Sequence, residues 1–151
     1  MALIYSDICR YTLYRPEHGS IMSIANFKDK KVLVADPAAY TRNLIKNALL
    51  LLGITQVKES VDGRQAMAAL QVKHYDLIIS DWEMPELSGI DLLRKVRADD
   101  RMQNIPFIIL TGDASDDNRD EAELMGVSAF ITKPFRSDPL LEQVEKLLKK
   151  K

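Results

Sequence analysis

The stretch LIISDWEMPELSG, residues 77–89, shows the pattern on which the whole fold is built. It opens with an apolar run, reaches a carboxylate at Asp81, and passes through Pro85 to Gly89, after which apolar residues recur at helical spacing. A short apolar run bounded by turn residues is typical of a buried strand. The stretch therefore predicts a strand, a polar turn and a helix in succession.

The same succession occurs five times between residue 30 and the end of the chain. The predicted strands are 32–35, 56–61, 77–80, 106–110 and 129–132, and each is followed by a helical pattern. Strands that are apolar throughout indicate a parallel sheet covered on both faces. Right-handed crossovers then favour a doubly wound α/β fold.

Three helix boundaries are predicted from local signals. Pro37 is expected in the first turn of the first helix, and Asp138 is expected to cap the last helix with Pro139 at its first position. The helix before Gly126 is expected over 117–125.

The composition describes one domain of ordinary size and excludes several classes of protein. The chain has 151 residues and a formal net charge of −1, which gives no electrostatic case for binding nucleic acid or an anionic membrane. No apolar run approaches the roughly 20 residues that cross a bilayer. Cys9 is the only cysteine, which excludes an internal disulfide and is compatible with the cytoplasm. Residues 1–29 lack the repeat and are interpreted as an N-terminal arm, and 30–151 as the domain.

Four polar residues follow directly after the predicted apolar strands: Asp36, Asp81, Thr111 and Lys133. In a parallel sheet these strand ends meet at one edge, where doubly wound folds bind their ligands. Two carboxylates there favour a hard cation such as Mg²⁺, and a carboxylate held this way can act as a nucleophile toward phosphorus. Taken singly, each residue also fits a helix cap, a turn or a solvated surface position.

The sequence resembles the receiver domain of bacterial two-component response regulators, most closely the stand-alone chemotaxis regulator type. The resemblance covers about residues 30–150. The matching stretches are VLVAD at 32–36, ISDWEMP at 79–85 with Ser88-Gly89, IILTG at 108–112, and AFITKPF at 129–135. The resemblance implies a flavodoxin-like (βα)5 sheet in the order 2-1-3-4-5.

The resemblance also implies a role for each site residue. Asp81 is the expected phosphoacceptor, and Lys133 the lysine that contacts the phosphoryl group. Thr111 and Phe130 are the expected switch residues. The resemblance further implies a cis peptide bond between Lys133 and Pro134.

The implied cation is Mg²⁺ or Mn²⁺, bound by Asp36, Asp81 and the backbone carbonyl of Glu83. The family usually has two adjacent acids after the first strand, whereas this chain has Asp36-Pro37. The missing acid is normally the direct metal ligand, so weaker cation binding is expected. Two hypotheses compensate for it: Asp36 moves into the inner shell, or Glu83 lends its side chain.

Glu83 and Asp113 occupy positions that tune the lifetime of the phosphorylated state in this family. Two acids there would hinder an attacking water molecule or a phosphatase. Equally, both fit solvated loop positions.

Three functions remain open from the sequence. The first is a single-domain receiver that is not an enzyme beyond its own phosphorylation and dephosphorylation. It would be phosphorylated by a sensor histidine kinase or a histidine phosphotransfer protein. It would then act on a downstream protein through the face of the fourth helix, fifth strand and fifth helix, or by pairing with a second copy. The second is a pseudo-receiver that binds partners without phosphate, which Pro37 supports. The third is a hydrolase or flavin-binding module, which the donor-poor stretch 36–41 disfavours.

Overall fold

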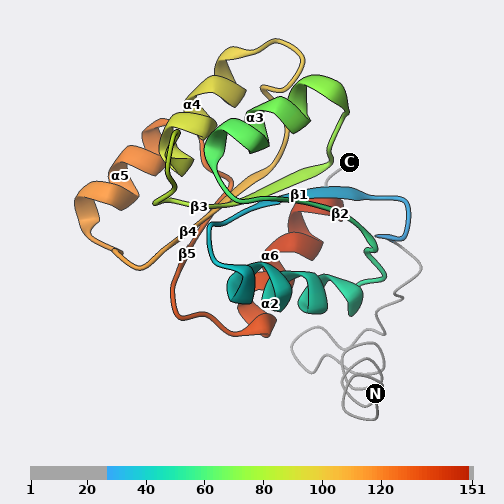
Figure 1. The fold of residues 1–151 in the computed structure, drawn as a ribbon. Helices are drawn as coiled ribbons and strands as arrows, with labels where there is room; N and C mark the ends of the chain where they lie inside the picture. Colours follow the sequence, from blue (N-terminus) through green and yellow to red (C-terminus); the bar gives the residue numbers. More distant parts are fainter. Residues whose placement is uncertain (1–26, 150–151) are drawn as a thin grey trace.

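The computed structural model describes residues 27–149, which form a three-layered α/β domain (Figure 1). Most of the predicted arm, residues 1–26, lies outside the described residues, so the boundary at residue 29 stays a prediction. The strands are β1 (Lys31–Ala35), β2 (Gln56–Ser60), β3 (Leu77–Asp81), β4 (Phe107–Thr111) and β5 (Ala129–Thr132). The helices are α2 (Ala39–Leu50), α3 (Gly63–Val72), α4 (Gly89–Ala98), α5 (Asp116–Leu124) and α6 (Ser137–Lys149). In this part of the chain no helix is long and apolar enough to cross a membrane.

The five strands form one parallel sheet in the order β2-β1-β3-β4-β5, which confirms the predicted fold. β2 pairs with one side of β1, whereas β3 pairs with the other side. The direction in which successive strands are added to the sheet therefore reverses at β1. This is the topological switch point, and it opens a crevice at the carboxyl ends of β1 and β3.

The two faces of the sheet carry separate hydrophobic cores. Alternate strand residues point to opposite faces, so Val34, Ile79 and Ile108 pack against α2 and α6, whereas Leu33 and Ile78 pack on the opposite side. Figure 1 shows α2 and α6 below the sheet and α3, α4 and α5 above it. Burial on both faces explains why the central strands are apolar throughout.

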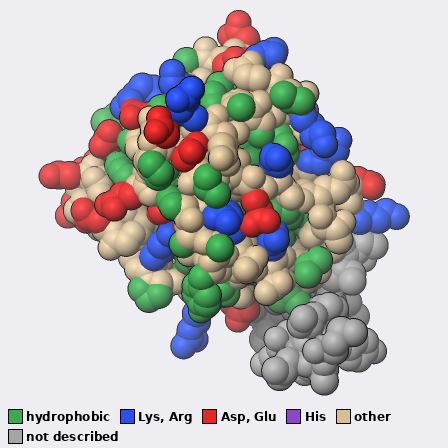
Figure 2. Space-filling view, in the orientation of Figure 1, with side chains coloured by type: hydrophobic (Ala, Val, Ile, Leu, Met, Phe, Trp, Pro, Cys, Tyr) green, Lys and Arg blue, Asp and Glu red, His purple; other side chains and the backbone are tan. Residues whose placement is uncertain are grey.

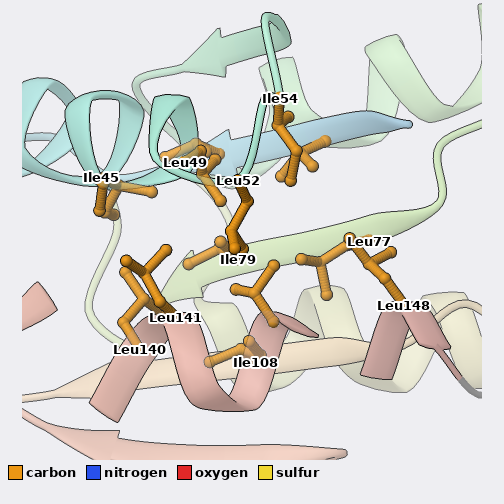
Figure 3. Packing of buried hydrophobic residues seen from close by; sticks show 14 of the residues in the cluster. Ile45, Leu49, Leu52, Ile54, Leu77, Ile79, Ile108, Leu140, Leu141 and Leu148 are labelled. Carbon is orange, nitrogen blue, oxygen red and sulfur yellow. The ribbon is translucent and has the colours of Figure 1, made fainter. Parts of the chain in front are cut away.

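The hydrophobic core below the sheet is formed by α2, α6 and the strands that they cover. Figure 3 shows side chains of α2 and α6 meeting those of β3 and β4. The labelled residues are Ile45, Leu49, Leu52, Ile54, Leu77, Ile79, Ile108, Leu140, Leu141 and Leu148. All ten are buried, so α2 and α6 are fixed against the central strands whose ends carry the polar residues.

Three predicted helix boundaries are wrong by one or two residues. α2 begins at Ala39 with Ala38 as its N-cap, so Pro37 precedes the helix. The physical reason is that the carboxylate of Asp36 accepts a hydrogen bond from the Ala38 N–H, which holds this segment in a turn. α5 begins one residue early, at Asp116, because the Ser115 hydroxyl accepts from the Asn118 N–H.

The last helix also begins earlier than predicted. α6 starts at Ser137, so Asp138 lies inside the first turn and Pro139 at the third position. A proline fits there because the first N–H groups of a helix have no partner within it.

Candidate functional site

The four polar residues predicted from the strand ends lie along one edge of the sheet. Asp36 follows β1 and Lys133 follows β5, whereas Asp81 and Thr111 are the last residues of β3 and β4. The strand register places Asp81 beside Leu110, directly before Thr111. The four residues therefore come from neighbouring strands.

Lys133 joins the two carboxylates. Its Nζ lies 2.8 Å from Asp36 Oδ2 and 3.2 Å from Asp81 Oδ1. The backbone N–H of Lys133 donates to the Thr111 carbonyl, and the Lys133-Pro134 peptide bond is cis, as the resemblance implied. One ammonium thus contacts both acids, so the carboxylates of Asp36 and Asp81 face the same point at the sheet edge.

Asp36 is deeply buried, with its side chain 1% exposed. Its Oδ1 accepts from the Ala38 N–H at 2.8 Å, and its Oδ2 bonds to Lys133. Its backbone N–H donates to the Ser60 carbonyl of β2. A buried carboxylate needs such partners, because an unpaired charge in the interior is costly.

Asp81 has a different environment from Asp36. Burial raises the pKa of the Asp81 carboxyl, the ammonium of Lys133 opposes that rise, and the negative charge of Asp36 adds to it. For Lys133, burial alone lowers the pKa, but the hydrogen bond and charge of Asp36 together with Asp81 raise it overall. Lys133 is therefore held as a cation, beside an Asp81 carboxylate that is only partly neutralised.

Thr111 is buried, but its hydroxyl is engaged away from the carboxylates. Its Oγ1 accepts from the Asp113 N–H at 3.0 Å and lies 3.2 Å from the Asp113 carbonyl, to which it donates. The Asp113 side chain is exposed and accepts from the Ser115 N–H. Thr111 thus anchors the loop after β4 in this state.

Phe130 lies in a small aromatic cluster next to the site. Its ring meets the Trp82 ring edge-on with centroids 6.3 Å apart, and the Arg119 guanidinium lies 4.8 Å from the Phe130 ring centroid. Trp82 directly follows Asp81, and Arg119 belongs to α5. The cluster therefore connects the residue beside Asp81 to the α5 helix.

The loop after β3 is fixed by close backbone approaches. A Cβ on Gly89 would lie 2.1 Å from the Asp81 carbonyl oxygen, and one on Gly63 would lie 2.1 Å from the Leu87 carbonyl oxygen. Glu86 adopts a positive φ of 71° in this loop. The side chain of Glu83 is exposed. Glycine at 63 and 89 thus lets the loop that carries Glu83 close onto the end of β3.

Two residues that contact this site have no role in the sequence-based prediction. Arg42 donates to the backbone carbonyls of Asp36 and Pro37, and Arg119 contacts Phe130. Nothing in the local sequence distinguishes either from an ordinary helix-surface arginine. Only the packing of α2 and α5 against the sheet edge reveals them.

The residue types at this sheet edge suit a hard cation, although they supply fewer carboxylates than a cluster of three acidic groups. Within residues 27–149 no group of three or more acidic, histidine or cysteine side chains is placed to hold a metal ion. Mg²⁺ is nevertheless commonly bound by one or two carboxylates, with waters and phosphate oxygens completing its shell. The convergence of Asp36 and Asp81 on the Lys133 ammonium supplies that minimum.

Comparison with known proteins decides the family. The model of the response regulator receiver domain matches residues 32–145. The chain belongs to the response regulator receiver domain family. A receiver domain is a signalling domain of two-component systems, so the predicted family is confirmed.

Relatives of this receiver domain include chemotaxis proteins. It is 39% identical over 120 residues to the chemotaxis protein CheY of Pseudomonas aeruginosa, covering 80% of this chain and 97% of that one. It is 34% identical to CheY-3 of Vibrio cholerae over 123 residues, covering 82% of this chain and 95% of that one. The resemblance to the stand-alone chemotaxis type is thus confirmed.

Solved structures agree with this receiver fold. A response regulator receiver domain from Francisella matches with a TM-score of 0.74 and 36% identity, over 81% of this chain and 98% of that one. The receiver domain of a sensor histidine kinase from Pseudomonas aeruginosa matches with a TM-score of 0.72 and 26% identity, over 80% and 98%. That second structure has a magnesium ion coordinated in its active site cleft.

Proposed function

We propose that this receiver domain accepts a phosphoryl group on Asp81 from a sensor histidine kinase or a histidine phosphotransfer protein. The observation that carries the proposal is the placement of Asp81. Its half-buried carboxylate ends a central strand and contacts a single ammonium, which is itself fixed by Asp36. This leaves an acceptor oxygen next to a fixed positive charge.

The transfer exchanges one bond to phosphorus for another. An oxygen of Asp81 attacks the phosphorus of the donor's phosphohistidine, a P–O bond forms, and the P–N bond breaks. The imidazole nitrogen keeps the electron pair of the broken bond and takes up a proton from solvent. Lys133 stabilises the charge on the phosphoryl oxygens, and its own hydrogen bond to Asp36 keeps it in place.

The cation proposed for this site is Mg²⁺ or Mn²⁺. Asp36, Asp81 and the Glu83 backbone carbonyl would hold it, and it would neutralise charge on the incoming phosphoryl group. Because Pro37 supplies no carboxylate, we propose weak binding. The exposed Glu83 side chain is available as an additional ligand.

The proposed readout is the face formed by α5, β5 and α6. A phosphoryl group on Asp81 offers the Thr111 hydroxyl a new acceptor, which competes with its bonds to Asp113. Movement of Thr111 and Phe130 then changes the contacts of Phe130 with Arg119 on α5. The α5 segment Asp116–Leu124, DDNRDEAEL, holds five acids. Acidic side chains also gather at the left of Figure 2, the side on which α5 lies in Figure 1. A basic downstream protein is the complementary partner.

Glu83 and Asp113 are proposed to lengthen the lifetime of the phosphorylated state. Both side chains are exposed beside the loops that follow β3 and β4. Their negative charge disfavours the approach of an attacking hydroxide or an acidic phosphatase group.

The decisive experiment is intact-mass spectrometry after incubation with Mg²⁺ and acetyl phosphate. A mass increase of about 80 Da that is absent in Asp81→Asn would establish an acyl phosphate at this carboxylate. The expected increase should vanish when a chelator replaces Mg²⁺.

The second candidate function is a pseudo-receiver that binds its partner without phosphate. Pro37 is the observation that favours it, because it removes one carboxylate from the cation site. A folded protein that gains no mass, alongside a control receiver domain that does, would support this function and overturn the first.

A further inference from the structure

Arg42 on α2 is hydrogen-bonded to the segment that carries Asp36. Its Nη1 donates to the backbone carbonyls of Asp36 at 2.7 Å and Pro37 at 3.2 Å, and its Nε donates to Glu59 Oε1 at 3.0 Å. Its side chain is only 13% exposed. The guanidinium therefore connects the β1–α2 turn to the neighbouring strand β2.

Glu59 serves as the anchor of this contact. Its second carboxylate oxygen accepts from Lys46 at 2.9 Å, and the hydrogen bond from Lys46 is the main cause of its lowered pKa, with Arg42 contributing in the same direction. Both cations come from α2, one turn apart. The two cations bond to different oxygens of Glu59, so Oε1 holds the planar guanidinium of Arg42 in one orientation whether or not Lys46 is present.

The turn after β1 depends on few other bonds. Residues 36–38 lie between β1 and α2, and Pro37 has no N–H to donate. The backbone groups of this turn bond as follows: the Asp36 N–H donates to Ser60, the Ala38 N–H to the Asp36 carboxylate, and the Ala38 carbonyl accepts from the Arg42 N–H. The Asp36 and Pro37 carbonyls accept from the Arg42 side chain, and Lys133 donates to the Asp36 carboxylate. Removing the Arg42 side chain would take away the hydrogen bonds that tie both carbonyls to α2 and loosen the backbone that places the Asp36 carboxylate.

We propose that Arg42 is a positioning residue of the phosphoacceptor site, whose guanidinium fork fixes the Asp36–Ala38 turn and thereby the Asp36 carboxylate. The inference rests on the proposed phosphorylation of Asp81. It matters more in this chain than in one with two adjacent acids, because Asp36 is the only carboxylate that the β1–α2 turn supplies.

The first test measures how phosphorylation of Asp81 by acetyl phosphate depends on Mg²⁺ concentration. In Arg42→Gln we expect the Mg²⁺ concentration for half-maximal rate to rise roughly tenfold, as is typical when the partner of a metal ligand is removed. The rate at saturating Mg²⁺ should stay close to that of the wild type, since Asp81 and Lys133 are untouched. A general destabilisation of the fold would instead lower the phosphorylation rate at every Mg²⁺ concentration.

Two further variants separate geometry from charge. Lys46→Gln removes the other cation from Glu59 without touching residues 36–38, so its Mg²⁺ dependence should match the wild type. Arg42→Lys keeps the charge but lacks the planar fork, so it should remain impaired. Full rescue by Arg42→Lys, or an equal shift in Lys46→Gln, would overturn the proposal.

The second test needs neither a cation nor a phosphodonor. Hydrogen exchange at the Ala38 amide reports its bond to the Asp36 carboxylate, and we expect exchange to accelerate in Arg42→Gln but not in Lys46→Gln. Unchanged exchange in Arg42→Gln would refute the positioning role. If the wild type gains no phosphoryl group, the proposed function fails, whereas the exchange result still decides the role of Arg42.

Discussion

The ammonium nitrogen of Lys133 lies 2.8 Å from Asp36 Oδ2, closing a contact between residues 97 positions apart in the chain. Asp36 is almost fully buried, whereas Lys133 is 24% exposed. The contact neutralises a buried carboxylate and at the same time holds the ammonium against Asp81. The same ion pair therefore stabilises the fold and positions the ammonium for the proposed phosphoryl transfer.

Lys133→Met is expected to destabilise the domain, because it leaves the buried Asp36 carboxylate without its cation. Removing one partner of a buried pair costs about 3–5 kcal/mol, and the partial exposure of Lys133 reduces the expected cost to about 1–3 kcal/mol. The pKa of Lys133 is raised by folding, so its contribution is present below the unfolded pKa and is lost as pH rises through the folded pKa.

Urea denaturation of both proteins from pH 7 to pH 11 checks this prediction. The difference in unfolding free energy should be constant near neutrality and shrink in the alkaline range. Equal stabilities at pH 7 would show that the ion pair contributes nothing.

Asp81→Asn is expected to stabilise the protein at pH 7. Folding raises the pKa of Asp81, chiefly through burial, so its charged form is disfavoured in the native state. The wild type therefore loses stability as pH rises through the folded pKa, and the amide avoids this loss. Asp81→Asn is therefore expected to have the larger unfolding free energy at pH 7.

The measurement is the unfolding free energy of Asp81→Asn and the wild type at pH 7 and at a pH below the ordinary carboxyl range. The gain should disappear at low pH, where the wild-type carboxyl is already protonated. A gain that is the same at both pH values would have another cause, such as packing.

Pro37→Asp is expected to strengthen cation binding. The substitution restores a carboxylate beside Asp36, on an exposed residue that lies outside α2. Mg²⁺ should then raise the melting temperature of Pro37→Asp more than that of the wild type. A tenfold gain in affinity corresponds to about 1.4 kcal/mol of added stabilisation at saturating Mg²⁺.

Pro37→Ala is the matched control, because it removes the proline without adding charge. Thermal unfolding is measured for all three proteins with Mg²⁺ and with a chelator. The same Mg²⁺ response in Pro37→Asp and Pro37→Ala would place the cation away from this turn.

Gly89→Ala is expected to destabilise the domain by about 1–3 kcal/mol, the usual cost of overpacking. Its new Cβ would meet the Asp81 carbonyl oxygen at 2.1 Å, so the backbone beside Asp81 must shift. Gly112→Ala is the control, because a Cβ at Gly112 meets nothing within 4 Å.

Chemical denaturation and near-ultraviolet circular dichroism of Trp82, the only tryptophan, should detect both effects. The spectrum is expected to change in Gly89→Ala and to stay as in the wild type in Gly112→Ala. Equal stability of the two variants would contradict the close approach at Gly89.

The sequence predicted the strands and the residues at their ends because both leave local signals. Buried parallel strands are apolar throughout, and polar residues such as Asp81 and Lys133 stand out where those runs stop. Helix starts were predicted less well. Pro37 favours a first turn locally, but the bond from the Ala38 N–H to the Asp36 carboxylate delays the helix to Ala39.

The sequence by itself thus determined the fold class, the family and the identity of the polar residues at the sheet edge. Only the tertiary structure decided that Lys133 contacts both Asp36 and Asp81, that Thr111 is bonded to Asp113, and that Arg42 and Arg119 belong to the site. The physical reason is the difference in sequence separation between the two kinds of interaction. Apolar periodicity depends on neighbours a few residues away, whereas these contacts join side chains from different strands and helices, whose positions are fixed only when the two cores pack.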